Sequence, residues 1–282
     1  KPAKPEEKVV EKAPAPTPPE PPKPVKLTTA ELVKRFEECS TAAAAKDLVK
    51  LTGCYADDAT AGVIDSDQIY TGAKTIVEGF YQPFWAAFPD MIGSTQMTLA
   101  NGNSIVAMQI LQGTNTGPFM GMAPTGKKIG LTSMIVVEMT DEGKIRSEIH
   151  YADMATMIGQ LGMAKIPVRP VVGLMKAAEK LSIIASDSKT ESENVALIRQ
   201  SNDAFNKHDL AALTMMLTDD AAMYDYAAPA DALGKKAIEA GLKELFGAFS
   251  DMRGASTALW GAGDYVVNVA EWTGTNDGDM KS

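Results

Sequence analysis

The 282-residue sequence predicts an α+β protein built from two tandem copies of one domain behind a proline-rich tail. Three observations predict it: an internal repeat at a domain-sized offset, helical patterns that precede strand patterns in each copy, and a first segment with few aliphatic side chains to bury. We expect a disordered tail over 1–27, a first domain over 28–165, a linker over 166–192 and a second domain over 193–282.

The repeat runs through most of both domains. Five residues recur 162 positions later and, after a one-residue deletion, three more recur 161 positions later: Gly72, Lys74, Ile76, Gly79, Phe84, Phe88, Asp90 and Met91 match Gly234, Lys236, Ile238, Gly241, Phe246, Phe249, Asp251 and Met252. The match continues from Gly113-Thr114-Asn115 to Gly274-Thr275-Asn276. So many matches in one order indicate a tandem duplication.

Each copy is expected to begin with helices. In the first copy, Thr28-Thr29 precedes an amphipathic helix through Glu38, and a short helix covers Ala45 to Leu51. A third helix runs from Ala73 to Phe88, where Pro89 ends it. The second copy repeats this order over 193–207, 209–217 and 235–249.

Strands are expected to follow the helices. A strand-and-turn stretch lies around Ala59–Tyr70, and four strand patterns follow the third helix: Ser94–Leu99, Ile105–Gly113, Lys128–Met139 and Ile145–Tyr151. Asn101-Gly102 and Asp141-Glu142-Gly143 are hairpin turns, because glycine adopts the positive φ that such turns need. Helices followed by hairpin-linked strands predict an antiparallel sheet in an α+β domain.

The second copy is shorter than the first. It has strand patterns near 254–260 and 265–273, but no counterparts of Lys128–Met139, Ile145–Tyr151 or Asp153. We therefore expect a sheet with an open edge, so that either the natural chain is longer or a partner strand, from a second copy or another protein, covers the edge. The linker contains a short helical pattern over Leu174–Leu181.

Composition excludes several classes of function. The net charge of −9 and the pI of about 4.9 disfavour binding to nucleic acid, and no apolar run is long enough to span a membrane. Two histidines and two cysteines leave little material for a metal site, so we expect no metal and no cofactor. Outside the cytosol, Cys39 and Cys54 are expected to form a disulfide, and in the cytosol to be buried thiols.

The tail differs from the rest of the chain. Residues 1–26 hold 9 of the 16 prolines, with 6 lysines and 4 glutamates. A segment of this composition cannot form a core, and the stretch from Pro14 to Pro24 favours extended polyproline II. Two interpretations stay open: a spacer that tethers an exported domain to the cell envelope, or a disordered extension in any compartment.

The first copy resembles the SnoaL-like polyketide cyclase family of the nuclear transport factor 2-like superfamily. The matching segments are Gly72…Ile76, Phe88-Pro89-Asp90-Met91, Gly117–Lys127 and Asp141–Ile145, followed by Asp153 and Gln160-Leu161-Gly162. The resemblance covers about 30–164 in the first copy and 193–280 in the second. It implies a cone of three helices packed on a curved antiparallel sheet, with a pocket, and dimers as a usual state. It fixes no reaction.

The resemblance implies that Asp153 is the acid/base carboxylate, whereas its position before the helix Met154–Leu161 favours an N-cap. Strand alternation places His150 on the opposite face from Asp153, which favours a surface or interface histidine. Glu138 and Glu148 are expected to face each other across the Asp141–Lys144 hairpin, as exposed strand charges or as a carboxylate pair.

Seven further residues are candidates for the pocket. Asn115 either binds a ligand carbonyl or forms a turn, and Tyr70 and Tyr81 either reach the pocket or belong to the core. The expected ligand-binding set is Trp85, Phe84, Asn115, Phe119, Met122 and Tyr70.

Two functions follow. One is a cofactor-independent enzyme that binds a small apolar carbonyl compound and moves a proton with Asp153. The other is a non-catalytic scaffold that binds an apolar ligand or a partner protein. The family's histidine on a preceding strand has no counterpart in Met134–Met139, which favours the scaffold.

Overall fold

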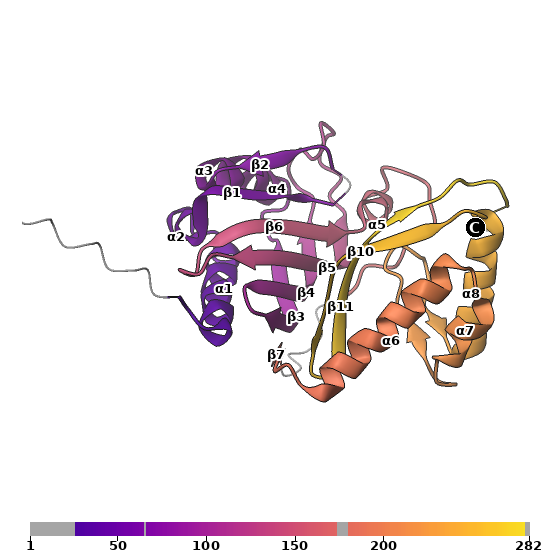
Figure 1. Ribbon diagram of the computed structural model, residues 1–282. Coiled ribbons are helices and arrows are strands. Elements are labelled where there is room, and N and C mark those ends of the chain that lie inside the picture. The colour runs from indigo at the N-terminus through magenta and orange to yellow at the C-terminus, as the bar shows by residue number, and fades with distance from the viewer. Residues whose placement is uncertain (1–25, 65, 174–179, 280–282) are drawn as a thin grey trace, which may run out of the picture.

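The computed structural model describes residues 26–64, 66–173 and 180–279. It contains two α+β units, the first coloured from indigo to magenta and the second from orange to yellow (Figure 1). The order of helices and strands in both units confirms the predicted α+β duplication. The expected tail and its polyproline stretch fall almost entirely outside the described residues.

Two disulfide-linked helices open the first unit. Helix α1 (Thr29–Ala44) begins at a capping box in which Thr28 and Glu31 each bond the other's backbone N–H, and it buries Leu32, Val33 and Phe36. Helix α2 (Leu48–Cys54) begins at Asp47, whose carboxylate accepts from Lys50 N–H.

The third helix of the first unit contains a π-helical turn. It consists of α3 (Ala73–Ile76), the π turn η1 (Val77–Tyr81) and α4 (Gln82–Ala87), whereas its counterpart α8 (Lys235–Ala248) is α-helical throughout. A π turn accommodates one extra residue in a helix. The extra residue explains why the repeat offset falls from 162 to 161. Because the π turn precedes Phe84, the offset is already 161 at this residue. Phe84 therefore corresponds to Leu245, and the predicted match with Phe246 was wrong.

A seven-stranded sheet forms the wall of the first unit. Its order is β2 (Ile69–Thr71), β1 (Tyr55–Val63), β6 (Ile145–Ala152), β5 (Lys128–Met139), β4 (Ser104–Thr114), β3 (Ile92–Asn101) and β7 (Leu181–Ile184). The sheet is mostly antiparallel, but β1 runs parallel to β6 and β7 runs parallel to β3. The expected linker helix falls mostly outside the described residues, and its last position, Leu181, begins β7.

One face of this sheet carries the core. Residues Ile105 and Ala107 of β4 alternate toward the same face as Ile135 and Val137 of β5, and they pack with the buried face of α1. A second cluster, around Phe88, joins the end of α4 to the start of β5 and to α5 (Met154–Gln160). The two clusters hold the helices against the concave sheet.

The second unit has fewer strands. It contains α6 (Lys189–Asn206), α7 (Leu210–Met215), α8, a short pair β8 (Ala222–Met223) and β9 (Ala232–Leu233), and the hairpin β10 (Arg253–Ala262) and β11 (Tyr265–Thr273). In the first unit β1 pairs with β6, and no described strand of the second unit corresponds to β6. Strand β8 therefore stays two residues long.

The linker connects the two units through polar contacts. Arg169 bonds the Asp231 carboxylate at 2.6 Å and the Asp225 carbonyl, and its guanidinium lies 5.4 Å from the centre of the Tyr226 ring. The Tyr226 hydroxyl reaches Met108 on β4, on the outer face of the sheet. The second unit therefore packs on that face, as Figure 1 shows. Among the described residues, no helix is long and apolar enough to cross a bilayer.

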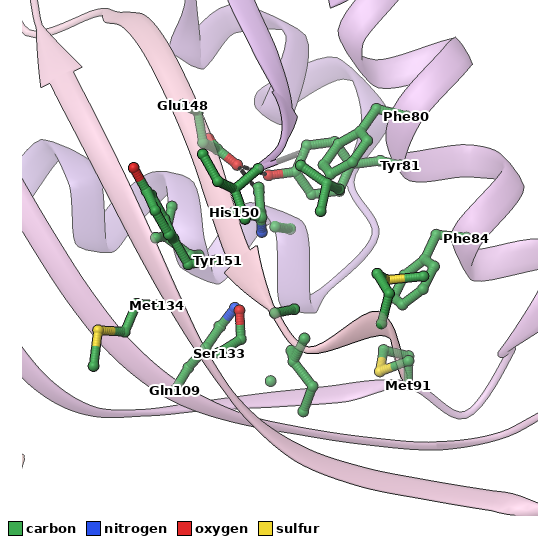
Figure 2. A pocket seen from close by; sticks show the side chains of 18 of the residues that line it. Phe80, Tyr81, Phe84, Met91, Gln109, Ser133, Met134, Glu148, His150 and Tyr151 are labelled. Carbon is green, nitrogen blue, oxygen red and sulfur yellow. Dashed lines mark hydrogen bonds and ion pairs between the residues drawn. The ribbon is translucent and has the colours of Figure 1, made fainter. Parts of the chain in front are cut away.

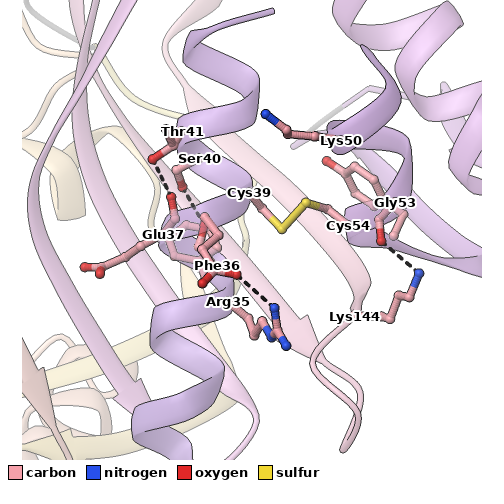
Figure 3. The surroundings of a disulfide bond; sticks show 12 residues. Arg35, Phe36, Glu37, Cys39, Ser40, Thr41, Lys50, Gly53, Cys54 and Lys144 are labelled. Carbon is pink, nitrogen blue, oxygen red and sulfur yellow. Dashed lines mark hydrogen bonds and ion pairs between the residues drawn. A yellow bond between two sulfur atoms is a disulfide. The ribbon is translucent and has the colours of Figure 1, made fainter. Parts of the chain in front are cut away.

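A disulfide joins α1 to α2 (Figure 3). The Cys39 and Cys54 sulfur atoms are 2.16 Å apart, and the two Cα atoms are 5.8 Å apart. Cys39 belongs to the buried face of α1, and Cys54 immediately precedes Tyr55, the first residue of β1. The pairing expected for an oxidising environment is thus present. It fixes the position at which β1 enters the core.

Candidate functional site

A cavity of about 1130 Å³ is lined mostly by the first unit, and its lining extends to the outer face of the sheet and to residues 225–227 of the second unit. Its inner walls come from the concave face of the sheet, from the helices α1, α2 and α4, and from the loop after β4. The residues expected to bind a ligand mostly line it: Tyr70, Phe84, Trp85 and Phe119. Its apolar walls and its size suit a small organic molecule.

The one carboxylate buried in this cavity belongs, among the described residues, to Glu148 on β6. Its side chain is 3% exposed and accepts hydrogen bonds from Tyr55 Oη at 2.7 Å and Tyr81 Oη at 2.5 Å. The His150 Nε2 atom lies 2.5 Å from the same carboxylate. Figure 2 shows the Tyr81 hydroxyl and the Glu148 carboxylate pointing toward one another, with His150 beside them.

Three separate features of the sequence bring these groups together. Glu148 and His150 are two residues apart on β6, so both point to the concave face. Tyr55 follows the disulfide-bonded Cys54, and Tyr81 is the last residue of the π turn. Because π turns shift the side chains that follow them, the extra residue of the first unit positions Tyr81 at the carboxylate.

The electrostatics of the cluster hold Glu148 as a carboxylate. Burial raises the pKa of Glu148, but the interaction with His150 and the hydrogen bonds from His150, Tyr81 and Tyr55 outweigh burial, so that its pKa lies below the ordinary value. Burial and the Glu148 charge raise the pKa of Tyr55 and Tyr81 well above the ordinary value. Both tyrosines therefore stay protonated and donate to the carboxylate at neutral pH.

A carboxylate accepts hydrogen bonds but cannot donate them. In the neutral imidazole, His150 Nε2 therefore carries the proton toward Glu148, and Nδ1 keeps its lone pair. Nδ1 has no hydrogen-bond partner within the described part of the chain. The ring also packs against Phe80, with 5.0 Å between the ring centres, which limits its rotation. This arrangement produces an oriented base on the cavity wall.

The interpretation of His150 as a surface histidine was wrong. Its side chain is 13% exposed and lines the cavity, because the face of β6 that carries residues 148 and 150 is the concave one. The expected pairing of Glu138 with Glu148 was also wrong, since Glu138 lies opposite Ser147 and bonds Ser104. The alternation of Glu148 and His150 two residues apart was the available signal. Which face was concave could not be seen from one strand.

Asp153 follows the end of β6 and caps α5. Its two carboxylate oxygens accept from Ala155 N at 3.0 Å and Thr156 N at 2.9 Å, as the N-cap interpretation expects. Asp153 also lines the cavity. It belongs to the part of the lining that continues to the outer face of the sheet and to residues 225–227 of the second unit. Its role as an acid or base stays a prediction.

Asn115 is a structural residue. It is fully buried, donates to the carbonyls of Ala87 and Gly117, and accepts from Thr125 N at 2.8 Å. Its amide therefore has no capacity left for a ligand carbonyl. Met122 is 39% exposed and lies outside the cavity lining, although Phe119 and Met120 of the same loop belong to it.

Metal-binding groups are not assembled here. Within residues 26–64, 66–173 and 180–279, no three histidine, cysteine, aspartate or glutamate side chains lie close enough to hold an ion. The chemistry that the described cluster supports is proton transfer by an oriented imidazole.

Comparisons with known proteins agree with this fold. The family model of the SnoaL-like polyketide cyclase matches residues 30–161, and that of the SnoaL-like domain matches residues 198–282. The chain belongs to the SnoaL-like family, with two tandem copies of its domain. It is thus a pocket protein with the nuclear transport factor 2-like fold. No curated protein matches the sequence significantly.

Solved structures match about half of this chain. IdmH from Streptomyces antibioticus is 25% identical, with 47% of this chain and 99% of that chain covered and a TM-score of 0.41. A SnoaL-like protein from Jannaschia sp. CCS1 is 16% identical, with 52% and 99% covered and a TM-score of 0.44. An LEH-like epoxide hydrolase from M. tuberculosis is 16% identical, with 48% and 92% covered and a TM-score of 0.39.

Proposed function

We propose that the first unit is a cofactor-independent enzyme that moves a proton on a small apolar carbonyl compound. The observation that carries the proposal is the buried cluster of Glu148, His150, Tyr55 and Tyr81 on the wall of the apolar cavity. Strongly coupled titratable groups in a cavity are typical of sites that do chemistry. A structural role alone would not need an imidazole that faces the cavity.

In the proposed step, His150 Nδ1 takes the proton from a carbon next to the carbonyl group. The electron pair of the broken C–H bond forms a C=C bond, and the carbonyl π electrons move to the oxygen, giving an enolate. The imidazolium then returns the proton to the same or a conjugated carbon. Glu148 holds the ring and stabilises the imidazolium, while the two tyrosines hold Glu148.

The resemblance implies this proton-transfer role for Asp153 instead. Both oxygens of Asp153 already accept backbone hydrogen bonds, so we assign the proton transfer to His150 and keep Asp153 as the competing candidate. The two candidates lie at different places on the cavity wall and are separable by substitution, because asparagine caps a helix as well as aspartate does.

The test uses 2-tetralone, an apolar ketone with acidic hydrogens beside its carbonyl. Exchange of these hydrogens in D2O is followed by NMR, with the buffer rate subtracted. We expect His150→Gln and Glu148→Gln to slow the catalysed exchange by about 10²-fold or more, and Asp153→Asn to retain it. A wild-type rate in His150→Gln would overturn the assignment. Binding of 2-tetralone without catalysed exchange would favour the ligand-binding scaffold.

A further inference from the structure

Ser133 on β5 is an unpaired polar group in the cavity wall. Its side chain is 1% exposed, and its Oγ has no hydrogen-bond partner within residues 26–64, 66–173 and 180–279. A buried hydroxyl without a partner costs free energy, and native proteins rarely tolerate one without a reason. Because Ser133 lines the cavity, a bound molecule is positioned to supply the missing partner.

Two polar neighbours extend Ser133 into a row. Gln109 lies directly opposite Ser133 on β4, and Thr95 lies opposite Gln109 on β3, so all three point to the concave face. All three line the cavity. The Gln109 amide has no hydrogen bond to another described residue. We call Thr95, Gln109 and Ser133 the oxygen strip.

Ser133 of the strip and His150 lie on the neighbouring strands β5 and β6 and on the same face of the sheet. Ser133 pairs with Ala152 on β6, and Ile135 pairs with His150, so Ser133 and His150 are diagonal neighbours. Such neighbours are about 7–8 Å apart. A ketone spans this gap when its oxygen bonds the strip and the adjacent carbon faces the imidazole. Figure 2 draws Gln109, Ser133 and His150 around the same space.

We infer that the oxygen strip binds the carbonyl oxygen of the substrate, which is therefore a neutral apolar ketone or ester. This inference rests on the proposed function and names its substrate class. The strip has two hydroxyls and an amide that donate hydrogen bonds but no cation, so it suits a neutral oxygen and not a free carboxylate. Glu148 carries a negative charge nearby, which disfavours an anionic ligand further.

The oxygen strip also stabilises the enolate that forms in the proposed reaction. The carbonyl oxygen gains negative charge when the carbon loses its proton, so donors placed at that oxygen stabilise the enolate more than the ketone. The proton goes to His150, and no other reactant is required. Phe80, Phe84 and Trp85 line the cavity from the helical side and offer an apolar wall to the rest of the molecule.

Binding of three matched probes tests the strip. They are 2-tetralone, its oxygen-free analogue tetralin, and the anion 1,2,3,4-tetrahydro-2-naphthoate, each titrated by calorimetry with the full chain. We expect the wild type to bind 2-tetralone about threefold to tenfold more tightly than tetralin, the gain of one neutral hydrogen bond. The carboxylate should bind more weakly than the ketone.

Ser133→Ala and Gln109→Leu should each reduce this preference, and together they should abolish it. Thr98→Val is the matched control, because Thr98 is a second buried hydroxyl without a partner but does not line the cavity. It should leave the preference unchanged. Removing an unpaired hydroxyl costs little stability, so Ser133→Ala is expected to fold.

Three results would overturn the inference: no measurable binding of 2-tetralone, tighter binding of the carboxylate, or a ketone preference that survives both strip substitutions. Failure of the strip is distinguishable from failure of the proposed base. His150→Gln should keep the ketone preference while losing the hydrogen exchange, whereas Ser133→Ala should lose the preference and retain part of the exchange.

Discussion

The two units enter and leave their third helix through the same turns, but they differ in the side chains that surround their interiors. Gly72 and Gly234 both have a positive φ, of 91° and 84°, and their N–H groups bond the carbonyls of Ala59 at 2.8 Å and Ala221 at 2.7 Å. Only glycine adopts this conformation readily at a helix entry. The same turn therefore starts the third helix in both copies.

The contacts at the end of the third helix are also the same in both units. Asn115 and Asn276 donate to the last helical carbonyls, of Ala87 at 3.3 Å and Ala248 at 3.0 Å. Gly117 and Gly278 also lie against this helix end, where an added Cβ would approach a backbone oxygen to 2.1 Å and 2.0 Å. These repeated residues hold the end of the helix against the segment that follows β4 in the first unit and β11 in the second.

The site depends on residues that only the first unit has. The π turn, the disulfide, β5 and β6 have no described counterparts in the second unit, and they supply Tyr81, Tyr55, Ser133, Glu148 and His150. The comparison shows that the duplicated residues maintain the fold, whereas the unshared residues form the cavity cluster.

The largest expected effect comes from the disulfide. Cys39→Ala with Cys54→Ala should reduce the unfolding free energy of the first unit by about 3 kcal/mol, since the bridge closes a loop of 15 residues. Hydrogen exchange read by mass spectrometry should show faster exchange in the first unit only. Equal loss of protection in both units would mean that they unfold together, which would break the comparison.

A smaller effect, with opposite signs in the two units, is expected at the matched glycines Gly79 and Gly241. A Cβ at Gly79 would lie 2.8 Å from the Tyr70 ring, so Gly79→Ala should destabilise the protein by about 1–3 kcal/mol. Nothing lies within 4 Å of the corresponding point at Gly241 in α8, so Gly241→Ala should stabilise by about 0.5–1 kcal/mol. Thermal unfolding measures both changes; a shift of the same sign in both would contradict this packing.

The smallest effect is a difference in acid sensitivity. The pKa of Glu148 is lowered, so its contribution to stability is present above the ordinary glutamate pKa of about 4.5 and is lost as pH falls through the folded value. In the second unit, hydrogen bonds from Gly263 and Ser188 N–H lower the pKa of Glu191 to about 2.

The contribution of Glu191 is therefore lost between about pH 4.5 and pH 2. Denaturation between pH 7 and pH 2 should show a shallower slope in Glu148→Gln for the first unit and in Glu191→Gln for the second. An unchanged slope in both variants would show that these carboxylates are equally bonded in the unfolded chain.

The sequence alone determined the fold class, the duplication and the element order, because these follow from periodicity, turn residues and repeated spacing. Lys128–Met139 was predicted to the residue, and the capping position of Asp153 was visible from the helix pattern that follows it. The apolar lining by Phe84, Trp85 and Phe119 was also anticipated, because large aromatic residues cluster around the third helix and the loop after β4.

Only the tertiary structure decided which residues form the polar cluster. Glu148 and His150 share a face by alternation, but whether that face is concave depends on how β6 lies between β1 and β5. Tyr55 lies 93 residues from Glu148 in the sequence and Tyr81 lies 67 residues from it. Local periodicity carries no information across such separations, because contacts between distant strands and helices are set by packing of the whole domain.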